Sequence, residues 1–199
     1  MTDIEYYHDS EKPYGLTYGA WTIKWWHWAL SLPDDISPLI DKSGRNAGVN
    51  QPKKDVWFLA GTWATEIDSN IPLRVVSIPY GRSILFPVIN CEANPIEYPH
   101  LRTDMDLIDQ VTQDENTIVL KEALVNNISL PPQRVKSDPF VFPLTLSSRD
   151  GENVNTTAAA DGFWIFLKPL PRKAYDLQFR GACEMGRLKT AVKYRISVK

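Results

Sequence analysis

The sequence has little cysteine, no basic cluster and no long apolar run, and each absence narrows what the protein can be. Its two cysteines, Cys91 and Cys183, form no metal-ligand spacing; we expect buried thiols in a cytoplasm, or one disulfide in a trimmed secreted chain. No run of lysine or arginine exceeds Lys53-Lys54 and the formal net charge is −2, so the basic surface that nucleic acids or anionic membranes attract is missing. No stretch of about 18 uninterrupted apolar residues occurs, which excludes a membrane-spanning helix.

Cofactor, metal and nucleophile motifs are also missing. The segment Gly15-Leu-Thr-Tyr-Gly lacks the lysine and the preceding strand of a phosphate-binding loop, and no serine or cysteine lies in a nucleophile elbow. His100 has possible oxygen ligands nearby in Asp104 and Asp106, but a capped helix start explains both aspartates without a metal. We therefore expect no cofactor and no metal.

The first residues of the chain are acidic and lack both a basic start and an apolar core. The chain as given therefore carries no signal peptide, and we expect a cytoplasmic protein. We expect no nucleic-acid or membrane partner, and the oligomeric state stays open.

The residues that are present indicate a mainly β protein. Fifteen prolines and ten glycines interrupt many short apolar runs, and 199 residues that are 43% hydrophobic can bury one sizeable core. Polar and apolar side chains alternate through 175–180 and 192–198, as in strands with one wet face, whereas 163–168 is apolar on both faces. We predict a single domain over 1–199, an antiparallel β-sandwich, jelly-roll-like, of about eight strands.

Four of the seven tryptophans lie in the segment W-T-I-K-W-W-H-W, Trp21 to Trp28. At about 100° per residue the apolar side chains form two neighbouring strips, which predicts a helix that begins after Thr17 and is covered on two sides. We expect Trp25 to face the sandwich and Trp26 to lie under the segments before or after the helix. The predicted organisation is an N-terminal arm over 1–16, the helix over 17–32, a long loop over 33–54 and a β body over 55–199.

Three shorter signals lie within the β body. Thr103, followed three residues later by Asp106, makes a capping box and predicts a short helix near 104–112. Asn126-Asn127 tolerates the left-handed turn of a hairpin. The polar segment 147–160 is predicted to be a long loop.

Four phrases extend this pattern through most of the chain. They are Tyr18-Gly-Ala-Trp-Thr-Ile-Lys-Trp-Trp-His-Trp, Val56-Trp-Phe-Leu-Ala-Gly-Thr, Ile78-Pro-Tyr-Gly-Arg-Ser-Ile-Leu-Phe-Pro-Val-Ile-Asn and Asp161-Gly-Phe-Trp-Ile-Phe-Leu-Lys-Pro-Leu-Pro. The sequence thereby resembles a family of uncharacterised microbial proteins, which implies a β-sandwich-like fold and no assigned activity. Many members are exported and tend to carry cysteines near positions where this chain has Asn46, Ala47, Val75 and Val76, so the resemblance implies an intracellular variant. Glutamine often replaces His27 in the family, which argues against a catalytic histidine there.

The surplus of aromatic residues is the feature that points to a function. An exposed ring beside amide and carboxylate groups is what sugar binding uses, because stacking gives affinity and hydrogen bonds give identity. Most tryptophans at helical or strand spacing are nevertheless core residues, and we expect five or six of the seven to be buried. The leading hypothesis is a module that binds a small polar ligand or a carbohydrate. The candidate ligand-binding residues are Trp26, Trp63, Tyr80, Asn90, Glu92 and Glu66.

Two other classes of function stay open. A hydrolase or lyase would use the loop carboxylates Glu66 and Glu92, with Glu97 near the second, and His27 as a base; carboxylates across a cleft suit glycoside chemistry. The same carboxylates would serve equally as loop groups that bond to backbone N–H. A structural or interaction protein would instead use the wet sheet edges or the arm.

Overall fold

The computed structural model describes residues 4–62, 69–145, 153–184 and 186–199, which form two packed β-sheets and two α-helices. Sheet A runs in the order β1 (Val56–Phe58), β3 (Ser83–Ala93), β8 (Asn153–Leu167) and β6 (Gln133–Arg134), with β7 (Phe140–Thr145) paired to the first part of β8. Sheet B runs in the order β2 (Leu73–Ile78), β10 (Lys189–Val198), β9 (Ala174–Cys183), β4 (Ile118–Val125) and β5 (Ile128–Ser129). The helices are α1 (Tyr18–Leu30) and α2 (Asp104–Asn116), with short 3-10 turns at Pro13–Gly15 and Asp34–Ile36.

The mainly β, sandwich-like fold is as predicted, but the two sheets are mixed rather than antiparallel throughout. β1 pairs in parallel with β3, and β10 in parallel with β2. Parallel neighbours cannot be joined by a tight hairpin, so these pairings come from distant parts of the chain and leave no local signal. The described residues form ten strands rather than about eight, and the jelly-roll assignment stays a prediction.

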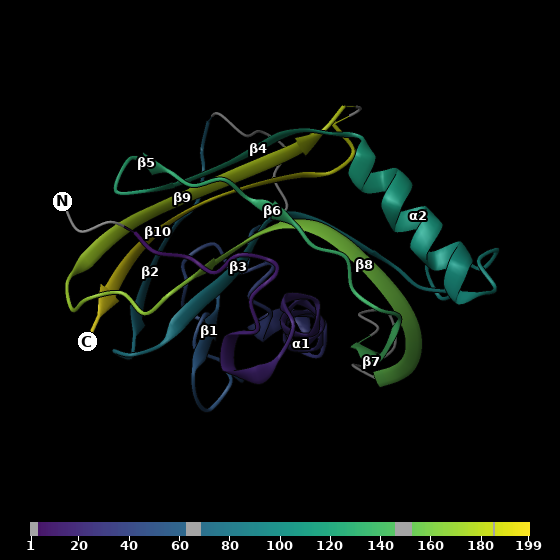
Figure 1. Cartoon of the computed structure of the whole chain (residues 1–199), viewed down its shortest axis with the longest axis horizontal. Helices are drawn as coiled ribbons and strands as arrows, with labels where there is room; N and C mark the ends of the chain where they lie inside the picture. The colour runs from purple at the N-terminus through teal and green to yellow at the C-terminus, as the bar shows by residue number, and fades with distance from the viewer. Residues whose placement is uncertain (1–3, 63–68, 146–152, 185) are drawn as a thin grey trace.

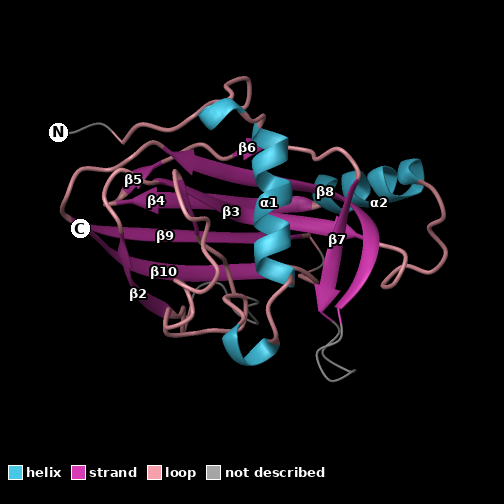
Figure 2. Ribbon diagram, turned by 90° about the horizontal axis from the view of Figure 1, so that it is seen from below, coloured by secondary structure: helices cyan, strands magenta, loops and turns pink. Residues whose placement is uncertain are grey.

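Sheet A is the middle layer of the molecule. One of its faces packs on sheet B, where Phe86 of β3 stacks on Phe179 of β9 with ring centroids 4.9 Å apart. The other face is covered by α1, which crosses the strands (Figures 1 and 2). Burial on both faces explains why residues 163–168 are apolar without alternation.

The tryptophan-rich helix α1 begins where the sequence predicts, because the Thr17 hydroxyl accepts a hydrogen bond from the Ala20 N–H at 3.1 Å. Three indole N–H groups each donate at 2.8 Å to a backbone carbonyl of a different segment: Trp25 to Leu59 next to β1, Trp21 to Pro13 in the arm and Trp28 to Val49 in the long loop. The helix is therefore covered on two sides, as its two apolar strips predict. All six tryptophans among the described residues are buried.

The second helix, α2, lies against β8 on the side opposite α1 (Figure 1). The predicted capping box is present: Thr103 accepts from the N–H of Asp106, whose carboxylate accepts from the N–H of Thr103. Leu107 and Val111 bury the apolar face against the far ends of β3 and β8, and the helix continues to Asn116, beyond the predicted end at 112. No helix among the described residues is both long and apolar enough to cross a bilayer.

Strand β8 corrects one prediction. Residues 153–160, which the sequence places in a loop, are the first half of this long, curved strand (Figure 1). Its polar Asn and Thr residues give no strand pattern in the sequence. In the structure, however, residues 153–158 pair with β7, and Ala158 to Ala160 are buried. The predicted hairpin turn is present, since Asn126 and Asn127 have φ of 49° and 64°. The remainder of the predicted loop, 147–152, lies outside the described residues.

Candidate functional site

The candidate ligand-binding residues that the structure describes do not form one site. Tyr80 lies in the turn before β3, whereas Asn90 and Glu92 lie near the other end of the same strand. At about 3.3 Å per residue, the part of β3 from Ser83 to Asn90 alone spans roughly 20 Å. Trp63 and Glu66 lie outside the described residues. The structure therefore offers two separate places, one at each end of β3.

Trp26 does not belong to either place. Its side chain is 7% exposed, and its ring packs edge-on against Trp25 with centroids 5.0 Å apart. The ring is covered, as its expected position under the neighbouring segments requires, so Trp26 does not supply the exposed ring that a ligand-binding role would need. No sugar could stack on Trp26 without displacing part of the core.

The Tyr80 end is an exposed aromatic surface. Gly81 has a left-handed φ of 85°, which lets the chain turn sharply between β2 and β3. The Tyr80 side chain is 56% exposed, and the guanidinium carbon of Arg172 lies 4.8 Å from its ring centroid. Pro169 and Pro171 line the same open depression. An accessible ring, a cation and two proline rings thus meet at one place.

The Glu92 end holds a pair of carboxyl groups. Asn94 Nδ2 donates to both carboxyl oxygens of Glu92, at 3.1 and 3.2 Å, and Asn94 Oδ1 accepts from the N–H of Glu97 at 3.1 Å. Burial, followed by the charge of the neighbouring Glu97, raises the pKa of Glu92 to about 8. Glu92 therefore keeps a proton at neutral pH, and Glu97 lies within reach to accept a hydrogen bond from it.

Two unused donors lie close to this carboxyl pair. Asn90 is opposite Gly162 in β8, and both Asn90 Nδ2 and Trp164 Nε1 are buried without a hydrogen-bond partner. A Cβ on Gly162 would lie 2.6 Å from Asn90 Cβ and 2.7 Å from Trp164 Nε1, so only glycine fits between them. Because both donors are closed to solvent, they can meet a ligand only if this end of the sheet moves.

His27 takes no part in the carboxyl pair. It lies half-buried against β7, with ring centroids 6.1 and 6.4 Å from those of Phe140 and Phe142. Burial, followed by the positive charge of Lys24, lowers the pKa of His27, so the ring is neutral at pH 7. Within the described ranges no cluster of three or more His, Cys, Asp or Glu could hold a metal ion.

Between α2 and sheet A lies a buried charged cluster that no sequence motif indicates. Asp161, 1% exposed, accepts hydrogen bonds from Arg134 Nε at 3.1 Å and Nη2 at 2.7 Å. Glu115 of α2, also 1% exposed, accepts from the Cys91 thiol at 3.5 Å. Burial, followed by the charge of Asp161, raises the pKa of Glu115 to about 8, and burial raises that of Cys91 well above its usual range. The one feature of the sequence that could have indicated this cluster is Asp161, an aspartate at the start of the apolar run in β8.

Stability is expected to fall as the pH rises from about 4.5 to about 8, because Glu115 binds its proton more tightly in the folded chain than in the unfolded chain. Below pH 4.5 both states are protonated and the stabilisation is complete; it is lost progressively up to the folded pKa and is constant above it. Urea unfolding of the wild type and of Glu115→Gln across this range tests the prediction. The variant should give a flatter profile, with exposed Glu184→Gln as the control. Equal slopes for Glu115→Gln and the wild type would contradict the assignment.

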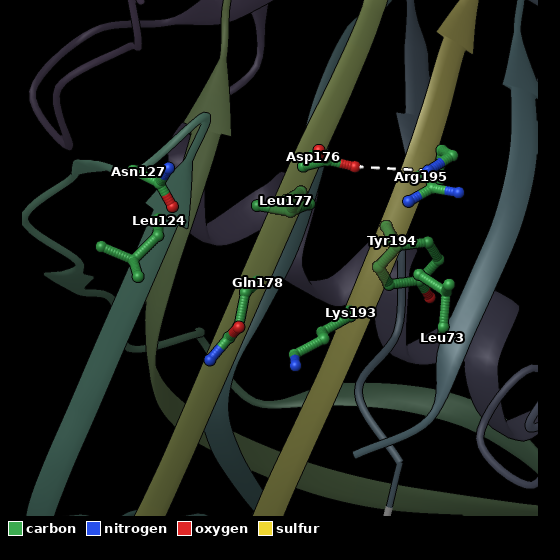
Figure 3. Close-up of a pocket in the computed structure, with 9 residues that line it drawn as sticks. All are labelled: Leu73, Leu124, Asn127, Asp176, Leu177, Gln178, Lys193, Tyr194 and Arg195. Atoms are coloured by element: carbon green, nitrogen blue, oxygen red, sulfur yellow. Dashed lines mark ion pairs between the residues drawn. The ribbon is translucent and has the colours of Figure 1, made fainter.

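The outer face of sheet B carries a shallow groove, which Figure 3 shows. Asp176 of β9 and Arg195 of β10 form an ion pair across it at 3.5 Å, with side chains 75% and 62% exposed. An exposed pair of this kind contributes about 0–1 kcal/mol. None of the described candidate residues lines the groove. It is the solvated sheet face that the alternation in 175–180 and 192–198 predicts.

The fold and these two places define a two-sheet β protein with a helical cover, and the comparisons with known proteins assign it no function. No protein-family model and no curated protein matches the chain. A solved structure, the cysteine protease inhibitor EhICP2 from Entamoeba histolytica, is similar over 74% of this chain and 99% of its own, with 10% sequence identity and a TM-score of 0.28. A likeness at this level carries no argument about activity.

Proposed function

We propose that the protein binds a small polar ligand, with carbohydrates as the leading class, at the surface formed by Tyr80, Arg172, Pro169 and Pro171. The observation that carries this proposal is the Tyr80 side chain, 56% exposed, with the Arg172 guanidinium 4.8 Å from its ring centroid. Among the described candidate rings, Tyr80 is the one that solvent reaches.

The chemistry of this surface suits a sugar. An aromatic ring stacks on the C–H face of a pyranose, and a guanidinium supplies several donors for hydroxyl or carboxylate oxygens. The prolines add apolar walls, and their fixed φ limits the conformational entropy lost on binding. The N–H of Tyr80 donates to the carbonyl of Lys199 at 2.6 Å, which fixes the turn against the end of β10.

Tyr80→Ala is expected to weaken ligand binding at least tenfold, about 1.4 kcal/mol, because the stacking surface is removed. Tyr80→Phe should keep most of the affinity, since it retains the ring, and Arg172→Ala should weaken binding to polar or acidic sugars. A glycan array identifies the ligand, and titration calorimetry then measures the affinity of the wild type and of each variant for it. Tryptophan fluorescence would report poorly, because every described tryptophan is buried and none of them lines this surface.

Exposed Arg102→Ala is the matched control for loss of a positive charge, and it should leave binding unchanged. Two results would contradict the proposal: no binding by the wild type across a broad panel, or equal affinity for the wild type and Tyr80→Ala.

Hydrolysis by the carboxyl pair is a second candidate function. Glycoside hydrolases keep their two carboxyl groups about 5–9.5 Å apart. The protonated Glu92 instead lies within hydrogen-bonding reach of Glu97, which supports a proton-sharing pair that activates water, as in aspartic proteases. A panel of chromogenic ester and peptide substrates tests this. Turnover should be lost in Glu92→Gln and Glu97→Gln and kept in Glu184→Gln; a wild type without turnover removes the candidate.

A further inference from the structure

Arg74 is a buried arginine that uses only part of its guanidinium. The residue is 1% exposed and points from β2 into the molecule. Its Nη1 donates to the carbonyl oxygen of Ala60 at 2.7 Å and to the hydroxyl of Tyr194 at 2.6 Å. Its Nε and Nη2 are also buried and have no hydrogen-bond partner. Three of the five N–H donors of the guanidinium are therefore unsatisfied.

No carboxylate among the described residues forms an ion pair with Arg74. Asp41, whose charge interacts with that of Arg74, is already bound by its own turn: one carboxyl oxygen accepts from the N–H of Ser43 at 2.8 Å and the other from that of Asn46 at 2.7 Å. A buried charge without a partner costs several kcal/mol. The unsatisfied edge of Arg74 therefore calls for an anion from outside the described chain.

The ion pair between the partly exposed Arg134 and the buried Asp161 shows what such an edge binds. Arg134 uses the same two nitrogens, Nε and Nη2, to hold both oxygens of Asp161 at 2.7 to 3.1 Å. These two N–H groups are parallel and form the fork that matches a carboxylate. Arg134 has its carboxylate, whereas the equivalent fork of Arg74 has none among the residues that the structure describes.

The orientation of the Arg74 fork is fixed by its surroundings. Tyr194 donates to the Ala60 carbonyl at 2.6 Å and lies beneath the guanidinium, 5.5 Å from ring centroid to Cζ. The turn 41–46 covers the base of the side chain, because a Cβ on Gly44 would lie 2.9 Å from Arg74 Cβ. The N–H of Val75 donates to the carbonyl of Ser43 at 3.2 Å, so a weak backbone contact ties this turn to β2.

We propose that the Nε and Nη2 edge of Arg74 is a binding site for an oxyanion, with a carboxylate as the class that fits its geometry, and that the turn 41–46 moves to admit it. This site is independent of the Tyr80 surface. Its donors lie on a fixed fork, so binding needs two oxygens held side by side, which a halide lacks.

The experiment measures thermal stability in acetate, citrate and inorganic phosphate against chloride at matched ionic strength. A ligand that binds the folded state raises the melting temperature in a saturable way. The wild type should show such a rise with the carboxylates. Arg74→Met should lose it, and Arg74→Lys should weaken it at least tenfold because the fork is lost. Arg195→Met, which removes a cation from the outer face of the same sheet, should keep it. A response to phosphate alone would support the oxyanion site and reassign its class.

A second measurement on the wild type guards against variants that fail to fold. The Nε–H resonance of Arg74, identified by NMR, should shift on titration with acetate. An unshifted resonance at tens of millimolar acetate, or an equal thermal response in Arg74→Met and Arg195→Met, would overturn the proposal. A third result would also overturn the proposal. If the Nε–H resonance changed in Glu66→Gln or Asp68→Asn but did not respond to acetate, Arg74 would pair with a carboxylate of its own chain.

Discussion

Replacing Trp25 with alanine is expected to unfold the protein or to lower its free energy of unfolding by about 3–5 kcal/mol. The side chain is 1% exposed, and its ring meets those of Trp26, Trp28 and Trp164 edge-on at centroid distances of 5.0, 6.1 and 5.3 Å. Its N–H satisfies the carbonyl of Leu59. The substitution removes an indole from between α1 and sheet A and leaves that carbonyl without its donor.

Urea unfolding followed by circular dichroism measures the effect of Trp25→Ala. Trp25→Phe should cost less, about 1–2 kcal/mol, because it keeps a ring and loses the hydrogen bond. Lys24→Ala, an exposed position on the same helix, should change little. A loss below about 1 kcal/mol for Trp25→Ala would show that α1 is dispensable for the core.

The substitution Arg134→Met is expected to cost about 3 kcal/mol, since it leaves a buried carboxylate without its main partner. The Asp161 side chain is 0% exposed, while Arg134 is 31% exposed, so the arginine is the partner that solvent partly screens. Lys136 Nζ, 3.9 Å from Asp161, compensates only in part. The expected loss of stability therefore lies at the lower end of the range of about 3–5 kcal/mol for breaking a buried ion pair.

A double-mutant cycle separates the pair from the rest of its surroundings. Arg134→Met combined with Asp161→Asn should cost less than the sum of the single changes. Arg195→Met breaks an exposed pair and should cost under about 1 kcal/mol. Hydrogen exchange should also become faster in α2 for Arg134→Met, because the cluster ties this helix to β8. Equal costs for Arg134→Met and Arg195→Met would contradict the buried-pair assignment.

Those parts of the fold that depend on local signals could be predicted from the sequence. The Thr17 cap, the Thr103 capping box and the Asn126-Asn127 turn each need only neighbouring residues, and all three are present. Alternation over 175–180 and 192–198 likewise specifies strands with one wet face.

Features set by distant pairing could not be predicted. The parallel pairing of β2 with β10 joins segments more than a hundred residues apart. The polar start of β8 escaped prediction for a different reason, because its Asn and Thr side chains hide a strand that pairs with the preceding strand β7. Asp161 is buried because Arg134, 27 residues away, supplies its partner. Such pairs leave no periodic pattern.

The candidate site divides for a similar reason. Tyr80 and Asn90 are ten positions apart, which would be a short distance in a helix or a folded loop. Because most of the chain between them is the extended strand β3, they lie toward opposite ends of that strand. Chemistry-bearing residues could be recognised from their types, whereas their grouping depended on the conformation between them.

The position of β10 within sheet B affects how the protein is made. This strand lies between β2 and β9, yet it follows every other strand of the sequence. During translation the facing edges of β2 and β9 therefore stay unpaired until β10 has left the ribosome. Unpaired strand edges of this kind can pair with other chains. Sheet B can close only after β10 has been synthesised, so the edge of β2 stays unpaired while every strand from β3 to β9 is made.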